Sequence, residues 1–350
     1  MKQLTVAVPS YNSEAFLDIC LSSFIYQDGS VDERLEVLII NDGSTDSTVA
    51  VANEWVSKYP DTFVLINKEN GGHGSGINAG IDHARGRYYK VVDSDDWVVT
   101  ASIKELLDAL EHTDADAVVT GYHTVNISSG VTLSYSAGCN DKAQEGSLEE
   151  FMKDYESAPA AQSFHGLMYN TAFYRNTGIR MSEKLFFEDQ EYAILPFVHV
   201  KTILRLPCFF YEYRIGSTGQ SVDFTNQAKR AGQFLKVVKK MCSYHRTVEA
   251  KMSEGRLDDA QEQFLIRRLS NAAVSYMATV LIKNNDKKQG RADAAEFSVY
   301  LKKTEYQIYA RTKKKYDAMR ALSYMPCAAK LYSGLFNSAV YGRFKKIWTK

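Results

Sequence analysis

The sequence lacks a long apolar run, because no stretch of 18 apolar residues occurs anywhere in its 350 residues. No transmembrane helix is therefore predicted. Its five cysteines are an odd number, are widely spread and form no CxxC pair. This pattern argues against a disulfide framework or a zinc site and favours a reducing cytosol. The first residues, MKQLTVAVPSYN, are too few and too polar for a signal peptide, so we expect a cytoplasmic protein.

Proline is also scarce, and none occurs between Pro207 and Pro326, which predicts long helices in that part of the chain. The net charge is zero, yet residues 1–228 carry a net charge of −16 and residues 229–350 a net charge of +16. Such asymmetry predicts two parts, for which we expect boundaries of 1–222 and 223–350, the second helical. The basic part either faces an anionic surface or is attracted to the acidic part.

Short apolar runs alternate with helical patterns through the first 120 residues. Strands are predicted over residues 4–8, 35–40, 63–66, 88–92 and 117–120. This alternation is typical of an α/β fold with a mostly parallel sheet flanked by helices, in which ligands bind at the carboxyl ends of the strands. A helix is expected over 14–27 with Ile19 and Cys20 on its buried face. A pair of strands is expected over 201–206 and 209–213, separated at Pro207.

The stretch YYKVVDSDDW (residues 88–97) places Asp93, Asp95 and Asp96 at the end of a predicted strand. Three carboxylates in four residues repel one another unless a cation lies between them. Mg²⁺ and Mn²⁺ take oxygen ligands and are often shared with a substrate phosphate. One interpretation is therefore a site for a metal and a diphosphate. The other is an acidic turn that caps the next helix.

Four segments together resemble a known family: TVAVPSYNSEAF (5–16), VLIINDGSTDST (37–48), NKENGGHGSGINAGIDHARGRYYKVVDSDDW (67–97) and FFEDQEY (186–192). In this order and spacing the chain resembles the family 2 glycosyltransferases of GT-A fold. The resemblance is clearest over residues 1–125 and extends to about residue 220. It implies an inverting glycosyltransferase that uses a nucleotide sugar, with a GT-A domain followed by an α-helical C-terminal domain.

The resemblance also implies a uridine nucleotide, with Asp42 accepting a hydrogen bond from uracil and Tyr11 packing near the base. The further residues it places at the nucleotide are Pro9, Asn12, Asn70, Gly71, Asp93, Ser94 and Arg214. It implies a Mn²⁺ or Mg²⁺ ion held by Asp93 and Asp95. Asp96 could replace Asp95 in that role, and the spacing leaves this open.

On the acceptor side, the resemblance implies that Asp189 is the base, with Glu188 supporting it. The alternative is that both are acidic residues placed at a helix start. Residues 71–80 read as a glycine-rich flexible loop without a dinucleotide fingerprint or P-loop lysine, and a helix is expected over residues 75–84. Many relatives carry an Arg that is missing from this stretch. His73 either lies near the nucleotide or, as is more frequent for a lone histidine in a loop, is simply exposed. His165 receives no assigned role.

The acceptors implied by the resemblance are a saccharide, a lipid-linked sugar or a glycoprotein glycan. Two other functions stay open: a sugar nucleotidyltransferase and a non-catalytic nucleotide-sugar-binding module. The first needs an Arg- or Lys-bearing glycine loop after the first strand, where this chain reads PSYNSEAF. Basic residues 313–315 and 343–350 flank aromatic residues, which is typical either of a peripheral membrane contact or of an ordinary helix packed on the catalytic domain. No nucleic-acid motif is present, and the oligomeric state is open, with a homodimer as one option.

Overall fold

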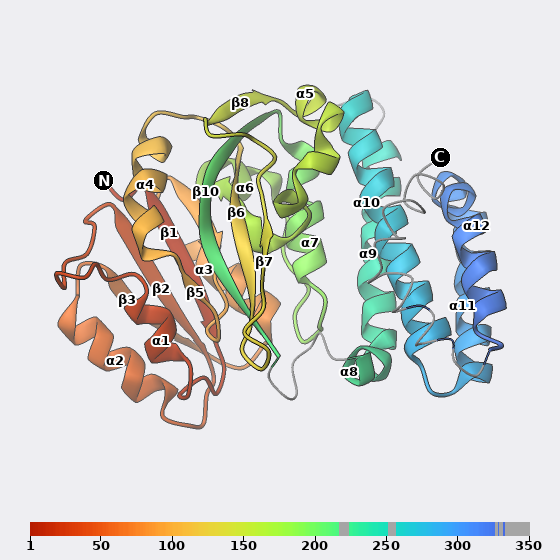
Figure 1. Ribbon diagram of the computed structural model, residues 1–350, viewed down its shortest axis with the longest axis horizontal. Coiled ribbons are helices and arrows are strands. Elements are labelled where there is room, and N and C mark those ends of the chain that lie inside the picture. The colour runs from red at the N-terminus through yellow and green to blue at the C-terminus, as the bar shows by residue number, and fades with distance from the viewer. Residues whose placement is uncertain (217–223, 251–256, 326–327, 329–331, 333–350) are drawn as a thin grey trace. The chain divides into compact units, whose positions relative to one another are not determined.

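The computed structural model describes residues 1–216, 224–250, 257–325, 328 and 332 of the chain (Figure 1). The chain forms two compact units. The first contains residues 1–217 together with 257–261, and the second contains residues 218–256 and 262–350.

The first unit is built on a ten-stranded mixed sheet with the order β3-β2-β1-β4-β9-β6-β10-β5, while β7 pairs with β6 and β8 with β10. The strands β3, β2, β1 and β4 are parallel and lie side by side (Figure 1). β9 runs antiparallel to both of its neighbours, and β10 runs parallel to β6. The bounds are β1 Leu4–Ser10, β2 Leu35–Asp42, β3 Phe63–Lys68, β4 Tyr88–Val91, β5 Trp97–Val98, β6 Ala117–Asn126, β7 Thr132–Tyr135, β8 Gln144–Ser147, β9 Leu167–Asn170 and β10 Thr202–Ile215.

Helices flank this sheet, as the alternation of apolar runs predicted. They are α1 Leu17–Ser22, α2 Thr48–Lys58, α3 His73–His83, α4 Ile103–Glu111, α5 Leu148–Lys153, α6 Thr171–Thr177 and α7 Asp189–Ile194. Every residue of β1 and β2 is buried, as expected for strands covered on both faces. The predicted α/β class with a mostly parallel sheet is confirmed.

Two local predictions are wrong. The helix expected over 75–84 is confirmed as α3, but the flexible loop expected over 71–80 is wrong, because α3 already begins at His73. The glycines of this helix serve close packing: a Cβ on Gly76 would lie 2.8 Å from Pro9 Cβ. The expected strand pair around Pro207 is one continuous strand, β10, in which the register to β6 shifts between Arg205 and Phe209. A proline lacks the N–H that a ladder needs, and a bulge accommodates that loss without ending the strand.

The helix predicted over 14–27 is shorter than expected, since α1 covers only Leu17–Ser22. Cys20 is buried as predicted, but Ile19 is 51% exposed. The assignment of Ile19 to the inner face was therefore wrong.

The second unit is helical, which confirms the expectation for the C-terminal part. Its elements are α8 Phe224–Lys229, α9 Ala231–Ala250, α10 Asp259–Ala278 with a π-helical turn Thr279–Lys283, α11 Lys287–Thr304 and α12 Tyr306–Leu322. Glu305, just before α12, accepts hydrogen bonds from Arg246 and pairs with His245, both on α9. None of the helices in the described ranges is long and apolar enough to cross a bilayer. Lys313–Lys315 lie on α12, whereas residues 343–350 lie outside the described residues.

Candidate active site

The predicted ligand edge forms because parallel strands end together. β1 and β2 run in register so that Ser10 lies opposite Asn41. On the other side of β1, β4 ends at Val91, two residues before Asp93. The polar segments that follow these strands, including Asp42 at the end of β2, therefore meet at one edge of the sheet.

Asp42 is buried and its carboxylate is held by groups of the protein. Gly71 N–H donates to Oδ1 at 2.9 Å and Gly72 N–H donates to Oδ2 at 2.7 Å. The ammonium group of Lys68 lies 2.7 Å from Oδ1. Asp42 therefore fixes the turn that leads into α3, and its contact with a uracil remains a prediction.

The segment after β1 is exposed and joined to the turn after β2. Tyr11 is 53% exposed, so its ring is accessible to a ligand. Asn12 adopts a left-handed conformation with φ of 50° and accepts a hydrogen bond from the N–H of Thr45 at 2.8 Å. Its own N–H donates to Ser44 Oγ at 3.0 Å. Pro9 is buried within β1.

Residues 93–96, called here the acidic turn, are fixed from β10. The hydroxyl of Tyr211 donates to the Asp96 carboxylate and accepts a hydrogen bond from the N–H of Asp93 at 3.1 Å. The backbone N–H of Arg214 donates to Asp96 Oδ1 at 2.7 Å. The guanidinium of Arg214 lies 4.7 Å from the centre of the Phe16 ring. Asp96 is therefore a buried carboxylate held by two donors of one strand.

The other members of the nucleotide set lie around this edge. Ser94 is buried, and its Oγ lies 2.7 Å from Ser13 Oγ in the segment after β1. Asn70 is exposed, one residue before the turn that binds Asp42. Asp95 is half-buried, and within the described part of the chain its carboxylate receives a hydrogen bond from its own backbone but none from another residue. Its oxygens are therefore open to a ligand.

The carboxyl groups of the acidic turn titrate differently because of burial and mutual repulsion. Burial, followed by the charge of Asp93, raises the pKa of Asp95 to about 6. The same causes, with Asp95 added, raise the pKa of Asp96 well above its ordinary value. Burial also raises the pKa of Asp93, but His73, together with His165 and Lys90, brings that pKa below its ordinary value. The three neighbouring carboxylates of the acidic turn therefore favour the binding of a positive charge between them.

His73 joins the acidic turn to the segment that precedes α7. Its Nε2 lies 2.9 Å from Asp93 Oδ1 and its Nδ1 lies 2.6 Å from Glu188 Oε1. Burial lowers the pKa of His73, yet Asp93 and Glu188 together raise it well above its ordinary value. The expectation of an exposed His73 was therefore wrong.

Asp189 begins α7, and Glu188 directly precedes it. Burial, followed by the charge of Glu188, raises the pKa of Asp189 to about 6. Gln190 donates to Asp189 Oδ2 at 3.2 Å. The second oxygen of Glu188, Oε2, is buried and has no hydrogen-bond partner among the described residues. Phe187 has a φ of 75°, which is strained for a bulky residue and is typical of functional segments.

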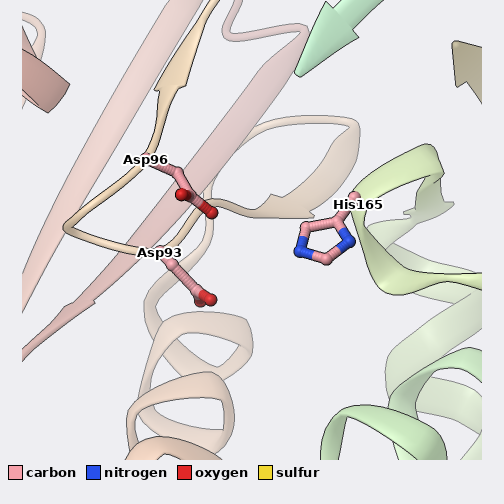
Figure 2. A group of neighbouring side chains, drawn as sticks. All are labelled: Asp93, Asp96 and His165. Carbon is pink, nitrogen blue, oxygen red and sulfur yellow. The ribbon is translucent and has the colours of Figure 1, made fainter. Parts of the chain in front are cut away.

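His165 lies close to the acidic turn. One ligand atom each from Asp93, Asp96 and His165 lie within 4.8 Å of one another. Figure 2 shows the Nε2 edge of the ring facing the two carboxylates, from a different segment of the chain. Burial lowers the pKa of His165 to about 3. Two carboxylates and a neutral imidazole are suitable ligands for a divalent cation. Asp95, the predicted ligand beside Asp93, lies outside this group of three.

Sequence reasoning singled out the acidic turn and the pair at 188–189, but it did not predict the contacts of His73 and assigned no role to His165. His73 contacts a residue 115 positions away in the chain, and no local pattern marks such a pairing. The one available signal for His73 was its place directly after two glycines at a helix start. For His165 the signal was a histidine between Phe164 and Gly166 just before a strand.

Residues 5–175 match the family described as Glycosyl transferase family 2. Among curated proteins, the chain is similar to Glycosyltransferase GlyA of Streptococcus pneumoniae serotype 4 (strain ATCC BAA-334 / TIGR4), with 34% identity over 39% of this chain and 19% of the relative. It is 25% identical to the Uncharacterized glycosyltransferase EpsJ of Bacillus subtilis (strain 168), over 60% of both chains. It is also 25% identical to the Poly(ribitol-phosphate) beta-N-acetylglucosaminyltransferase TarS of Staphylococcus aureus (strain Mu50 / ATCC 700699), over 77% of this chain and 45% of TarS. The chain thus spans between a fifth and three fifths of these relatives' lengths.

Solved structures agree with the fold. The crystal structure of S. aureus TarS 1-349 matches with a TM-score of 0.65 and 19% identity, over 95% of this chain and 91% of that one. The same fragment in complex with UDP-GlcNAc matches with a TM-score of 0.53, also at 19% identity, over 89% and 92%. Residues 5–175 of this chain therefore form a glycosyltransferase family 2 domain, and the first unit of the chain has the GT-A fold.

Proposed function

We propose that the protein transfers a sugar from a UDP-sugar to a hydroxyl group of a saccharide, lipid-linked or glycoprotein-glycan acceptor, with inversion and with the help of a divalent cation. One observation carries this proposal. His73 is hydrogen-bonded to Asp93 on one side and to Glu188 on the other. Carboxylates suited to a metal and a diphosphate, and a carboxylate pair suited to proton removal, therefore belong to one site.

On the donor side, the proposal assigns the nucleotide to the edge formed by the ends of β1, β2 and β4. The accessible ring of Tyr11 supports a packing role against the base. The guanidinium of Arg214 is half-buried near the acidic turn and suits a phosphate by its planar set of donors. Asp93 with Asp95 or Asp96 would hold the cation. When bound, a Mn²⁺ or Mg²⁺ ion would stabilise the negative charge that develops on the leaving diphosphate.

On the acceptor side, Asp189 takes the proton from the attacking hydroxyl. The hydroxyl oxygen forms a bond to the anomeric carbon on the face opposite the bond to the diphosphate, which breaks and releases UDP. A pKa of about 6 supports this role, because a base whose pKa lies near the working pH is both ionised and basic enough. Glu188 positions His73 and, through it, Asp93.

The decisive experiment measures UDP release over a panel of UDP-sugars, with Mn²⁺ and with EDTA, in the presence of candidate acceptors. UDP-GlcNAc is the first donor to try, because a relative that covers 77% of this chain is named as an N-acetylglucosaminyltransferase. Acceptor-dependent UDP release supports the proposal. Tight binding without release would identify a non-catalytic module, and pyrophosphate release from UTP and a sugar 1-phosphate would identify a nucleotidyltransferase.

We also propose a peripheral membrane contact through the basic part of the chain. Residues 229–350 carry a net charge of +16, and α12 bears three consecutive lysines, Lys313–Lys315. Each Lys or Arg near an anionic surface contributes ~1 kcal/mol, so a few would bind a protein reversibly. Full-length protein should float with anionic vesicles, and a variant with Glu at positions 313–315 should float less. Equal behaviour of both proteins would refute a role for these lysines.

A further inference from the structure

His165 is held more rigidly than a surface histidine would be. It lies in the 3₁₀ turn η4 (Phe164–Gly166), just before β9. The ammonium group of Lys90, on β4, donates to the carbonyl oxygens of Phe164, His165 and Leu167 at 3.0, 2.5 and 3.0 Å. Because Lys90 lies in the strand that leads into the acidic turn, it fixes the backbone of His165 relative to that turn.

The imidazole ring itself is fixed by aromatic neighbours and by Ser163. It stacks on Tyr213 with 4.2 Å between ring centres and lies against Phe164 and Tyr211 at 4.1 and 4.8 Å. Its Nδ1 lies 2.6 Å from Ser163 Oγ. Among the described residues no hydrogen-bond donor or acceptor is in reach of Nε2, and this edge of the ring faces Asp93 and Asp96 (Figure 2).

That Nε2 atom is buried in a residue that is 7% exposed, and it has no hydrogen-bond partner among the described residues. A buried polar atom without a partner is destabilising. The two carboxylates opposite it have hydrogen-bond partners in His73, Tyr211 and the N–H of Arg214, yet their negative charges still repel each other. A cation between the three groups would remove both costs, since it accepts lone pairs from the nitrogen and from the oxygens.

We propose that His165 supplies a nitrogen ligand to the divalent cation beside the oxygen donors Asp93 and Asp96, while the open carboxylate of Asp95 can supply a further oxygen. This inference depends on the divalent cation of the proposed function, and it names residues that bind that cation. A nitrogen ligand has a consequence for metal choice. Imidazole favours transition metals, whereas Mg²⁺ and Ca²⁺ prefer oxygen. The site should therefore bind Co²⁺ and Mn²⁺ more tightly than Mg²⁺.

Pulsed electron paramagnetic resonance on the full-length protein loaded with Mn²⁺ tests the ligand directly, because a coordinated nitrogen modulates the echo. We expect nitrogen modulation in the wild-type protein and its loss in His165→Gln. Titration calorimetry should show at least about tenfold weaker Mn²⁺ binding for that variant and a smaller change for Mg²⁺. The matched control is His83→Gln, an exposed histidine at the end of α3, which should change neither measurement.

The outcomes separate this inference from the proposed function. Tight Mn²⁺ binding without nitrogen modulation in the wild-type protein overturns the role of His165 and leaves the metal-dependent transferase intact. Modulation that persists in His165→Gln but disappears in His73→Gln also overturns it. Absence of Mn²⁺ binding together with UDP release in EDTA overturns both the inference and the metal dependence. If His165→Gln does not fold, the wild-type spectrum still decides the question.

Ser163→Ala gives an independent check on the orientation of the ring. Ser163 is a positioning residue, because its hydroxyl contacts Nδ1 and not the cation. Loss of such an outer contact typically weakens metal binding by about 10- to 100-fold. Nitrogen modulation should survive in Ser163→Ala while Mn²⁺ affinity falls. Unchanged affinity would contradict the proposed ring orientation.

Discussion

Replacing Asp189 by Asn should remove the base while keeping the shape of the side chain. Asp189 is half-buried at the first position of α7, where its Oδ2 accepts a hydrogen bond from Gln190. A positioned carboxylate typically contributes ~10²–10⁴-fold through general base catalysis. We therefore expect kcat for sugar transfer to fall by at least ~10²-fold, with little change in the affinity for UDP or for metal.

The pH dependence of the wild-type activity should also reflect the ionisation of Asp189. A base must be ionised, so activity should fall as the pH decreases through the pKa of Asp189 of about 6. At pH 5 about one tenth of the molecules would carry the ionised form. In Asp189→Asn this acidic limb should disappear from the residual activity.

As the pH rises, the free energy of unfolding should change in the direction opposite to the activity. The pKa of Asp189 rises from 3.8 to about 6 on folding, so the ionised carboxylate is less favourable in the folded state than in the unfolded one. The resulting loss of folding free energy is absent below pH 3.8 and fully present above pH 6, with an upper limit of about 3 kcal/mol. At pH 7.5 the Asn variant should therefore unfold at equal or higher urea concentration than the wild type, and the difference should vanish near pH 4.

Stopped and continuous UDP-release assays between pH 4.5 and pH 8.5, combined with urea unfolding, test this reasoning. Glu188→Gln is the comparison, because its carboxylate contacts His73 and should affect donor binding as well as turnover. If Asp189→Asn keeps most of its kcat, Asp189 is not the base, and Glu188 becomes the residue to test. A variant that loses both activity and UDP binding would indicate a displaced site instead.

The remaining predictions concern the acidic turn and the packing of α3. Asp95→Ala should weaken UDP binding and abolish transfer, and equal UDP affinity of the wild type in Mn²⁺ and in EDTA by calorimetry would refute the cation's role. Gly74→Ala places a Cβ 2.1 Å from Ser182 O and should cost ~1–3 kcal/mol in urea unfolding, whereas Gly232→Ala on α9 meets open space and should be neutral or stabilising by up to ~1 kcal/mol. Tyr211→Phe removes the hydroxyl that serves two residues of the acidic turn and should cost ~1–3 kcal/mol; a loss below 0.5 kcal/mol by the same measurement would count against that role.

The sheet was predictable because its information is local. Apolar runs of four to eight residues mark strands buried on both faces, and short helical patterns between them imply parallel pairing. The carboxyl ends of such strands meet at one edge, so the position of the acidic turn followed from the strand assignment alone. The same local reasoning failed at β10, where a proline reads as a break but is absorbed by a shift in register within one strand.

The chemistry of the site was only partly predictable, because long-range contacts decide it. A run of three aspartates indicates a cation, yet which of them face each other depends on donors from β10, more than a hundred residues later. Spacing left Asp95 and Asp96 equivalent. The fold makes them different, since Asp96 is fixed by Tyr211 and Arg214 while Asp95 remains open. No pattern in residues 93–96 contains that information.

The start of α3 determines how the parts of the site are placed relative to one another. The N–H groups of the turn before it hold Asp42, and its first residue, His73, contacts both Asp93 and Glu188. Further along α3, Asn78 exchanges two hydrogen bonds with the backbone of Met181, at 3.0 and 2.9 Å. One helix therefore fixes carboxylates that lie 146 positions apart in the chain, from the nucleotide side to the acceptor side.

This arrangement explains why glycines are concentrated in residues 71–80, where the sequence predicted a flexible loop running into a helix that begins at residue 75. A side chain at Gly74 would push α3 away from the backbone of Ser182, and one at Gly76 would push it away from β1. Either movement would carry His73 away from one of its two carboxylate partners. Because these glycines have no side chain, α3 can lie close to both β1 and the backbone of Ser182. At that short distance the His73 ring contacts both of its carboxylate partners. Flexibility is not needed for that role, and a rigid helix serves it better than a mobile loop.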